Sequence, residues 1–140
     1  MVITREADYA VRLAVCLAAR EPGVIASARL LAEEADAPYE LARTILGRLA
    51  DAGILASRRG RSGGFALARP AADIHLKELL SVVGENLTLN ICVNDSRDCG
   101  RSRDCPVHPV WLAASRVLSD FMAEQTLADL AAKPVAGAPC

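Results

Sequence analysis

Three cysteines stand close together in one polar stretch, residues 91–108, and thiols at such a spacing can hold a metal centre or form disulfides. They are Cys92, Cys99 and Cys105, in the pattern C-x6-C-x5-C, and His108 follows the third at C-x2-H. Cysteine thiolate is the usual ligand of iron–sulfur clusters. Structural zinc usually takes tighter C-x2-4-C pairs, so the wide gaps favour a loop wrapped around a multi-atom cluster. A zinc site, a thiol redox switch and ordinary loop cysteines are the alternatives.

The stretch itself is predicted to be a loop. Gly100, Pro106 and several Asp and Asn residues oppose a regular helix or strand. A long loop in a small domain is more often functional than not. Three thiolates would leave one coordination position of a cluster for another residue.

The composition predicts one helical domain in a chain of 140 residues. Apolar residues make up 52% and aromatic residues only 4%, so helices packed by small aliphatic side chains are expected. The formal net charge is −1, and any DNA-binding surface must therefore be local. The sequence shows no nucleophile–base pair, phosphate loop or catalytic metal pattern, so an enzyme is not expected.

The N-terminus predicts a cytoplasmic protein. Arg5, Glu6 and Asp8 interrupt any signal peptide, and no apolar run reaches the length of a membrane span. Thiols stay reduced in the cytoplasm, which favours metal or redox chemistry over structural disulfides. Cys16 lies among apolar residues and is predicted to be a buried small hydrophobe, while Cys140 is expected to be an uninvolved thiol.

The first part of the chain predicts a winged helix-turn-helix. Apolar residues recur at helical spacing over four ranges, 4–20, 27–36, 38–52 and 74–83. A short break at Ala37-Pro38 joins the second range to the third, which ends at Gly53. Two predicted strands, 54–57 and 65–68, then flank a basic, glycine-rich turn. That hairpin is predicted to be the wing.

The outward side of the third predicted helix and the wing are the candidate DNA surface. Arg43 is the candidate for base reading, because arginine can bind guanine bidentately. Arg48 and the wing arginines are expected to hold phosphates. Winged domains that bind protein instead are the alternative. The predicted DNA-binding residues are Ser27, Tyr39, Glu40, Arg43, Thr44, Arg48, Arg58, Arg59, Arg61, Ser62 and Gly63.

A long C-terminal helix is predicted from an apolar stripe that needs cover. The stripe consists of Val110, Ala114, Val117, Leu118, Phe121 and Met122. A second copy of the chain is the simplest cover, and symmetric dimers suit helix-turn-helix proteins. The expected organisation is a winged helix-turn-helix (1–84), a cysteine loop (85–108), a dimerisation helix (109–132) and a disordered tail (133–140). The fold class is mainly α with a small β-hairpin wing.

Several short motifs resemble the family of winged-helix iron–sulfur regulators that includes IscR and NsrR. Besides the three cysteines, they are Ile3-Thr4, Asp8-Tyr9-Ala10-Val11, Leu49-Ala50-Asp51-Ala52-Gly53-Ile54, Arg59-Gly60-Arg61-Ser62-Gly63-Gly64-Phe65 and Thr126-Leu127-Ala128-Asp129-Leu130. The resemblance implies a homodimeric transcriptional regulator, expected to be a repressor, that binds a double-stranded DNA operator. It also implies a 4Fe-4S or 2Fe-2S cluster that senses nitric oxide, redox or iron–sulfur status. No membrane and no small-molecule substrate are expected as partners.

The resemblance implies that Cys92, Cys99 and Cys105 are cluster ligands. For the fourth ligand this sequence carries both family solutions: His108 matches the IscR-like histidine, and Asp8 matches the NsrR-like acidic residue given by the other subunit. We favour Asp8, because a displaceable carboxylate suits a reactive cluster. The first cysteine gap is one residue longer than in typical relatives. A metal-independent thiol regulator and a zinc-stabilised winged module that binds protein are the competing functions.

Overall fold

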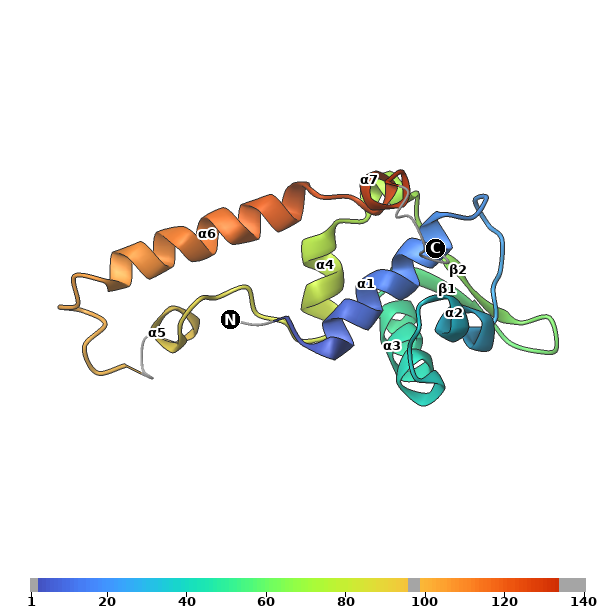
Figure 1. Ribbon diagram of the computed structural model, residues 1–140, viewed down its shortest axis with the longest axis horizontal. Coiled ribbons are helices and arrows are strands. Elements are labelled where there is room, and N and C mark those ends of the chain that lie inside the picture. The colour runs from blue at the N-terminus through green and yellow to red at the C-terminus, as the bar shows by residue number, and fades with distance from the viewer. Residues whose placement is uncertain (1–2, 96–98, 134–140) are drawn as a thin grey trace.

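The chain forms a body from which a long arm extends (Figure 1). The computed structural model describes residues 3–95 and 99–133. We call residues 3–83 and 125–133 the body, and residues 84–124 the arm. The elements are α1 (Arg5–Ala18), α2 (Ala28–Glu34), α3 (Tyr39–Asp51), β1 (Leu55–Arg58), β2 (Gly64–Leu67), η1 (Ala71–Asp73), α4 (Leu76–Val82), α5 (Ile91–Asn94), α6 (His108–Glu124) and α7 (Leu127–Ala131). The mainly helical fold with a β-hairpin wing is confirmed. Within the described ranges, no helix combines the length and apolar character needed to cross a membrane.

Helix α1 is the centre of the body. Thr4 caps it, because its side chain accepts a hydrogen bond from the Ala7 backbone N–H at 3.2 Å. Its buried side is rich in alanine, which lets α2, α3, α4 and α7 pack closely against it. Leu13 and Cys16 are fully buried there. Cys16 therefore lies in the core, as predicted.

The helix-turn-helix consists of α2 and α3, as the sequence predicts. The Ser27 side chain caps α2 by accepting a hydrogen bond from the Leu30 N–H at 3.2 Å. The turn passes through Asp36, whose φ of +51° is tolerated by aspartate better than by most residues. Helix α3 starts after Pro38 and is followed by Gly53 at φ +76°, the left-handed conformation typical of helix ends.

The wing is a two-stranded antiparallel hairpin in which Leu55 pairs with Leu67 and Arg58 with Gly64. A third segment joins it: Ala26 and Phe65 exchange backbone hydrogen bonds of 2.9 and 2.8 Å. Gly64 has φ +155°, and a Cβ at this position would collide with the Ala26 carbonyl. Only glycine therefore allows the wing to lie against the start of α2.

The fourth helix is shorter than predicted, because α4 begins at Leu76 instead of Ile74. Ile74 and His75 are extended and lie beside the segment before α7: the Leu76 N–H donates to the Gln125 carbonyl, and the Leu127 N–H to that of Ile74, both at 2.9 Å. His75 lies within the range 74–83 that was predicted to be helical, and for this residue the prediction is wrong. It precedes the helix, and its buried Nδ1 has no hydrogen-bond partner among the described residues.

The arm contains more regular structure than predicted. Residues 91–94 form the short helix α5, which packs against α6 and buries Cys92. The Leu89 N–H donates to the hydroxyl of buried Ser115 at 3.0 Å, and this bond fixes the incoming segment to α6. Helix α7 is a separate helix with its own capping box. The expected disordered tail and Cys140 lie outside the described residues, apart from Lys133.

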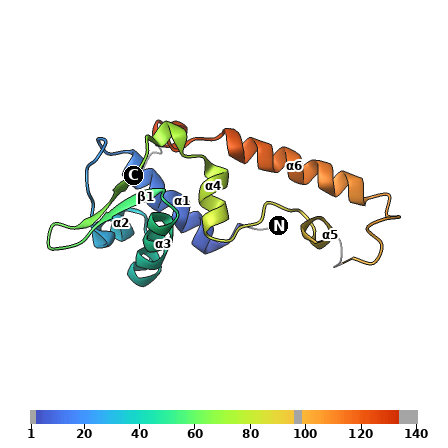
Figure 2. The ribbon, with the colours of Figure 1, turned by 180° about the vertical axis from the view of Figure 1, so that it is seen from behind.

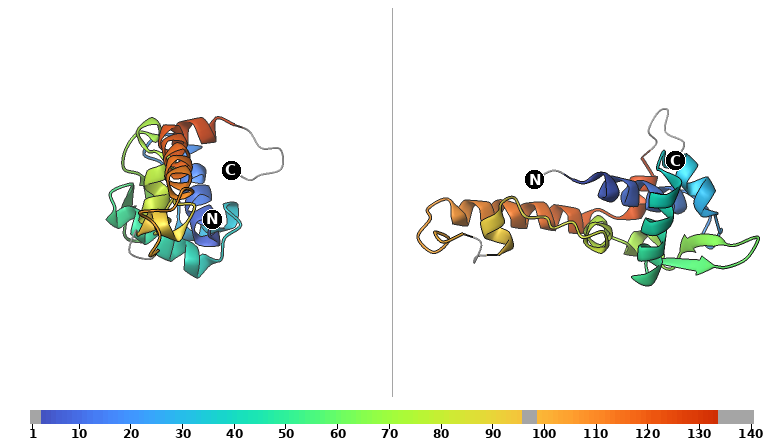
Figure 3. Two further views of the ribbon diagram at one scale, coloured as in Figure 1. Left: turned by 90° about the vertical axis from the view of Figure 1, so that its left-hand side faces the viewer. Right: turned by 90° about the horizontal axis from the view of Figure 1, so that it is seen from below.

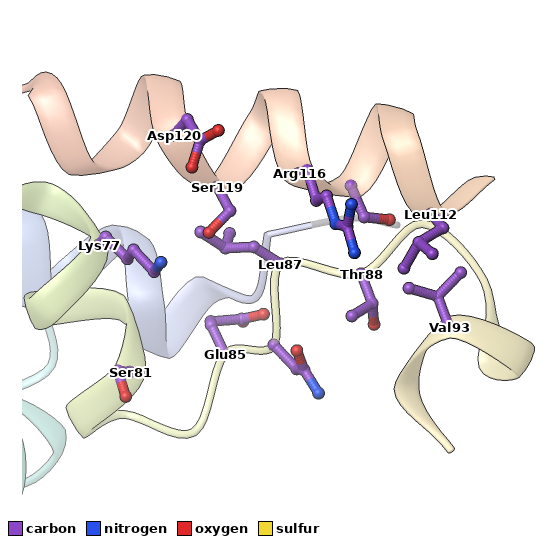
Figure 4. A pocket seen from close by; sticks show the side chains of 12 residues that line it. Lys77, Ser81, Glu85, Leu87, Thr88, Val93, Leu112, Arg116, Ser119 and Asp120 are labelled. Carbon is purple, nitrogen blue, oxygen red and sulfur yellow. The ribbon is translucent and has the colours of Figure 1, made fainter. Parts of the chain in front are cut away.

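A polar cavity of about 490 Å³ lies where the arm meets the body (Figure 4). Its walls come from α4, residues 85–88, α5 and α6. Lys77 of α4 and Arg116 of α6 line it from facing sides. Nearer α7, Leu118 and Met122 of α6 pack against the core of the body. The cavity means that α6 and α4 are not packed together along their whole shared length.

Candidate DNA interface and cysteine centre

The exposed face of α3 carries four of the predicted DNA-binding side chains, Tyr39, Glu40, Arg43 and Thr44. Arg43 and Glu40 form an ion pair of 3.2 Å, but their side chains are 63% and 76% exposed. Such a pair contributes little to stability. The Thr44 hydroxyl donates to the Glu40 carbonyl at 3.0 Å. Arg43 can therefore exchange its partner for a base edge at small cost.

The sequence reasoning missed Arg29, which lies on the first turn of α2. Its guanidinium carbon lies 4.7 Å from the centroid of the Tyr39 ring, within the range of a cation–π contact. This contact ties the start of α2 to the start of α3. The sequence shows a basic residue two positions after the Ser27 cap, but it does not show that this residue contacts Tyr39.

The hairpin and α3 both lie in the lower part of the body in Figure 2. The arginines of the wing are exposed. Arg58, Arg59 and Arg61 take part in none of the ion pairs of the described residues. The Gly63 N–H donates to the Gly60 carbonyl at 3.0 Å and closes the turn. Seen from below, the hairpin reaches beyond the helices of the body (Figure 3). Its guanidinium groups are free to meet a phosphate backbone.

Arg48 is engaged within the fold, unlike the other predicted DNA-binding arginines. It forms an ion pair with Glu6 of α1 and donates to the Val82 carbonyl of α4 at 2.6 Å. Its side chain is 39% exposed. Arg48 therefore connects α3, on which it lies, to α1 and α4, and sequence periodicity alone does not show this.

The three cysteines of the arm all carry free thiols. Cys92 is buried in α5, whereas Cys99 and Cys105 are partly exposed in the loop that precedes α6. In residues 3–95 and 99–133, no three His, Cys, Asp or Glu side chains form a group able to hold a metal ion. The structure thus places the predicted ligands on one segment without bringing them together.

The two candidates for the fourth ligand lie in different places. Asp8 is on α1 in the body and forms an ion pair with Arg12 at 2.7 Å, with both side chains about half exposed. His108 is the first residue of α6, and its backbone N–H donates to the Cys105 carbonyl at 3.2 Å. Its Nδ1 is buried and has no hydrogen-bond partner in the described part of the chain. Of the two side chains, only His108 belongs to the segment of the cysteines.

The chain matches the family model Rrf2, described as an iron-dependent transcriptional regulator, over residues 3–133. A Mycobacterium tuberculosis protein named as an HTH-type transcriptional regulator is 31% identical over 138 residues, covering 94% of this chain and 81% of that protein. Among solved structures, CymR of B. subtilis, the global cysteine regulator, is similar at a TM-score of 0.79 and 18% identity, over 96% of this chain and 99% of CymR.

IscR of T. potens is similar at a TM-score of 0.71 and 23% identity, over 93% of this chain and 85% of that one. At these identities the likeness to solved structures concerns the fold, a winged helix followed by a long helix. The proteins that this chain is similar to are transcriptional regulators, which are not enzymes. Because the family match extends over the body and the arm alike, the chain belongs to the Rrf2 family of transcriptional regulators, whose members act on DNA.

Proposed function

We propose that this regulator is a homodimeric repressor whose affinity for its DNA operator is set by an iron–sulfur cluster held by Cys92, Cys99 and Cys105. The observation that carries the proposal is the pairing of three free thiols on the arm with an arginine-tipped reading surface on the body. The description of the family as iron-dependent supports it.

Helix α3 enters the major groove in this proposal, as recognition helices do. Arg43 reads a base edge, and Arg59 with its neighbours in the wing holds phosphates. The exposure of these side chains supports the assignment. Arg29 joins the interface by keeping Tyr39 in place.

The donor set of the arm fits a cluster. Three soft thiolates suit iron–sulfur centres, and the unsatisfied Nδ1 of His108 is a buried nitrogen close in sequence to Cys105. When bound, the cluster supplies a redox-active centre that reacts with nitric oxide or oxidants. The chain's part is to bring its thiolates together and so to fix the loop relative to α6.

Asp8 is the candidate for the fourth position that we favoured from the sequence, and it would come from the other subunit. The cysteine loop lies at the end of the arm that points away from the body, whereas α1 is within the body (Figure 1). Two copies arranged with their arms side by side and antiparallel would bring the loop of one to the α1 of the other. Binding Asp8 would require the exposed Arg12 pair to break, at a small cost.

Anaerobic purification tests the proposal. The wild-type protein is expected to be coloured and to contain iron and acid-labile sulfide, and the Cys99→Ala variant to be colourless. DNA affinity is expected to change when nitric oxide bleaches the wild type. Asp8→Ala or His108→Ala, whichever removes the fourth ligand, is expected to lower cluster content. Wild-type protein without iron and sulfide would refute the cluster.

A metal-independent thiol regulator is the second candidate. The partly exposed thiols of Cys99 and Cys105 favour it, because exposed thiols are accessible to oxidants. The similar fold of CymR, a cysteine regulator, supports considering it. In that case the purified protein is colourless, and DNA affinity follows the addition of peroxide and of dithiothreitol.

A further inference from the structure

Arg48 connects the recognition helix to two other helices at one point of the body. It lies in the second half of α3, beyond the outward residues Tyr39 to Thr44. One nitrogen of its guanidinium pairs with the Glu6 carboxylate in the first turn of α1, and another donates to the Val82 carbonyl at 2.6 Å. Val82 is the last residue of α4.

The chemistry of this contact requires an arginine. The final carbonyls of a helix have no partner within the helix and attract cations. A guanidinium is a planar fork that can serve a carboxylate and a carbonyl at once, whereas the lysine ammonium is a point charge. The Arg48 and Glu6 side chains are 39% and 36% exposed, so the charge pair alone contributes little. The contact matters because it fixes the relative positions of the Glu6 carboxylate, the Val82 carbonyl and α3.

The contact lies where the chain leaves the body for the cysteines. After Val82 come Val83, Gly84 and Glu85, and the Glu85 carboxylate accepts a hydrogen bond from the Thr4 backbone N–H, the cap of α1, at 2.9 Å. The polar cavity beneath α6 interrupts the packing between α6 and α4. Residues 82–85 are therefore the short covalent route from the body to the cysteine segment.

We propose that Arg48 is a positioning residue, which holds α3 in register with α1 and with the end of α4 and so makes the placement of α3 depend on the state of the cysteine segment. The dependence on the cysteine segment rests on the proposed function, whereas the positioning of α3 does not. A displacement of residues 82–85 moves the Val82 carbonyl, and the guanidinium that it shares with Glu6 carries α3 with it.

This role differs in a measurable way from a phosphate contact. Removing a side chain that neutralises a phosphate lowers the slope of log affinity against log salt by about 0.9 per phosphate. Removing a positioning side chain weakens binding and leaves the slope unchanged, because the charges that meet the DNA are still present. The salt slope therefore separates the two roles of Arg48.

Arg48→Lys keeps the charge and removes the fork, and Glu6→Gln removes the charged acceptor. The matched control is Arg69→Lys: Arg69 likewise pairs with a carboxylate, Glu78, and donates to a backbone carbonyl, that of Asp73 at 3.1 Å. Its exposure of 38% is nearly the same, but it lies between the wing and α4 and not on α3. Circular dichroism and thermal unfolding would establish that each variant folds.

The probe is a duplex selected by wild-type protein from a random pool. Affinities would be measured by fluorescence anisotropy over a salt series, for cluster-loaded and cluster-free protein. Arg48→Lys and Glu6→Gln are expected to weaken binding by roughly twofold to thirtyfold with an unchanged salt slope. In cluster-free protein, the α3 amides of these two variants are expected to exchange hydrogen faster than those of the wild type. The ratio of loaded to cluster-free affinities is expected to move towards one.

Arg69→Lys is expected to change none of these quantities. Because a lysine at position 48 can still hold a phosphate, Arg48→Met is also measured. A lower salt slope for Arg48→Met, together with wild-type affinity for Glu6→Gln, would identify a phosphate contact and overturn the proposal. The proposal would also be overturned if folded Arg48→Lys had the same ratio of cluster-loaded to cluster-free DNA affinity as the wild type. If wild-type protein shows no dependence on the cluster, the proposed function fails, while the slope and exchange results still decide whether Arg48 positions α3.

Discussion

Individual arginines of the proposed DNA-binding surface are expected to have separable tasks. Arg43 stands on α3 with an exposed, exchangeable partner, and Arg59 stands in the wing without an ion pair among the described residues. A bidentate contact to a base discriminates by about 1–3 kcal/mol, whereas a phosphate contact carries no sequence information. The two positions should therefore respond differently to truncation.

We expect Arg43→Ala to relax sequence choice at one base pair of each half-site, with discrimination there falling about tenfold. We expect Arg59→Ala to weaken binding to all sequences and to lower the salt slope by about 0.9 for each phosphate that is no longer neutralised. Anisotropy titrations with single-base operator variants at several salt concentrations measure both effects. Equal reductions for all base variants with Arg43→Ala would contradict base reading.

At the scale of elements, the wing depends on one glycine. Gly64→Ala places a Cβ against the Ala26 carbonyl, at a φ that alanine rarely adopts, so the hairpin must move away from α2. We expect a loss of about 1–3 kcal/mol in the free energy of unfolding and weaker DNA binding. Gly47→Ala is the control, because a Cβ there meets no atom within 4 Å and alanine favours helices by about 0.5–1 kcal/mol. Urea unfolding measures both; a stable Gly64→Ala would refute the close approach.

The cap of α7 gives the fold a pH-dependent contact. The side chain and backbone N–H of Thr126 both donate to the Asp129 carboxylate, and these bonds lower the pKa of Asp129 below its usual 3.8. A group with a lowered pKa in the folded state stabilises the protein above its unfolded pKa and loses this effect as the pH falls through the folded one. The wild type should therefore be more stable than Asp129→Asn near neutral pH.

The difference between wild type and Asp129→Asn is expected to shrink as the pH falls below about 4. Denaturant unfolding of the two proteins at about pH 6 and about pH 3 measures the change. Asp120→Asn serves as the control, because Asp120 is an exposed residue of α6 at the edge of the polar cavity and has no ion pair among the described residues. A difference that stays constant between the two pH values would show that the charge of Asp129 has no part in the cap.

Local signals predicted the elements well, and contacts between distant segments account for the differences. The spacing of apolar residues, the Ser27 cap and Gly53 predicted α2, α3 and the wing, because these signals lie within the elements themselves. The extended backbone at His75 depends on Gln125 to Leu127, far along the chain. Helix α5 depends on α6 in the same way. The inward bonds of Arg48 depend on two other helices, which no periodicity encodes.

The whole molecule presents an uncovered apolar face along its arm. Val110, Val117 and Phe121 of α6 are 57%, 69% and 55% exposed, and Ala114 lies between them on the same stripe. The opposite side of α6 carries Leu112, Ser115 and Ser119, which face α5 and the polar cavity. Exposed apolar stripes of this kind mark association surfaces. A second copy is the expected cover, since a dimer also presents two reading surfaces to two half-sites.

Val117→Arg places a charge at the centre of this stripe and is expected to give a monomer by light scattering. Because a monomer can occupy only one half-site at a time, DNA affinity should fall by at least about tenfold. Ser119→Arg is the matched control: it adds the same side chain on the opposite face, where the polar cavity has room for it. A dimeric Val117→Arg protein would show that this stripe is not the contact surface.

If Asp8 is the fourth ligand, the monomer must also lose the cluster, whereas with His108 a monomer can retain it. The cluster content of Val117→Arg therefore decides which subunit completes the cysteine centre.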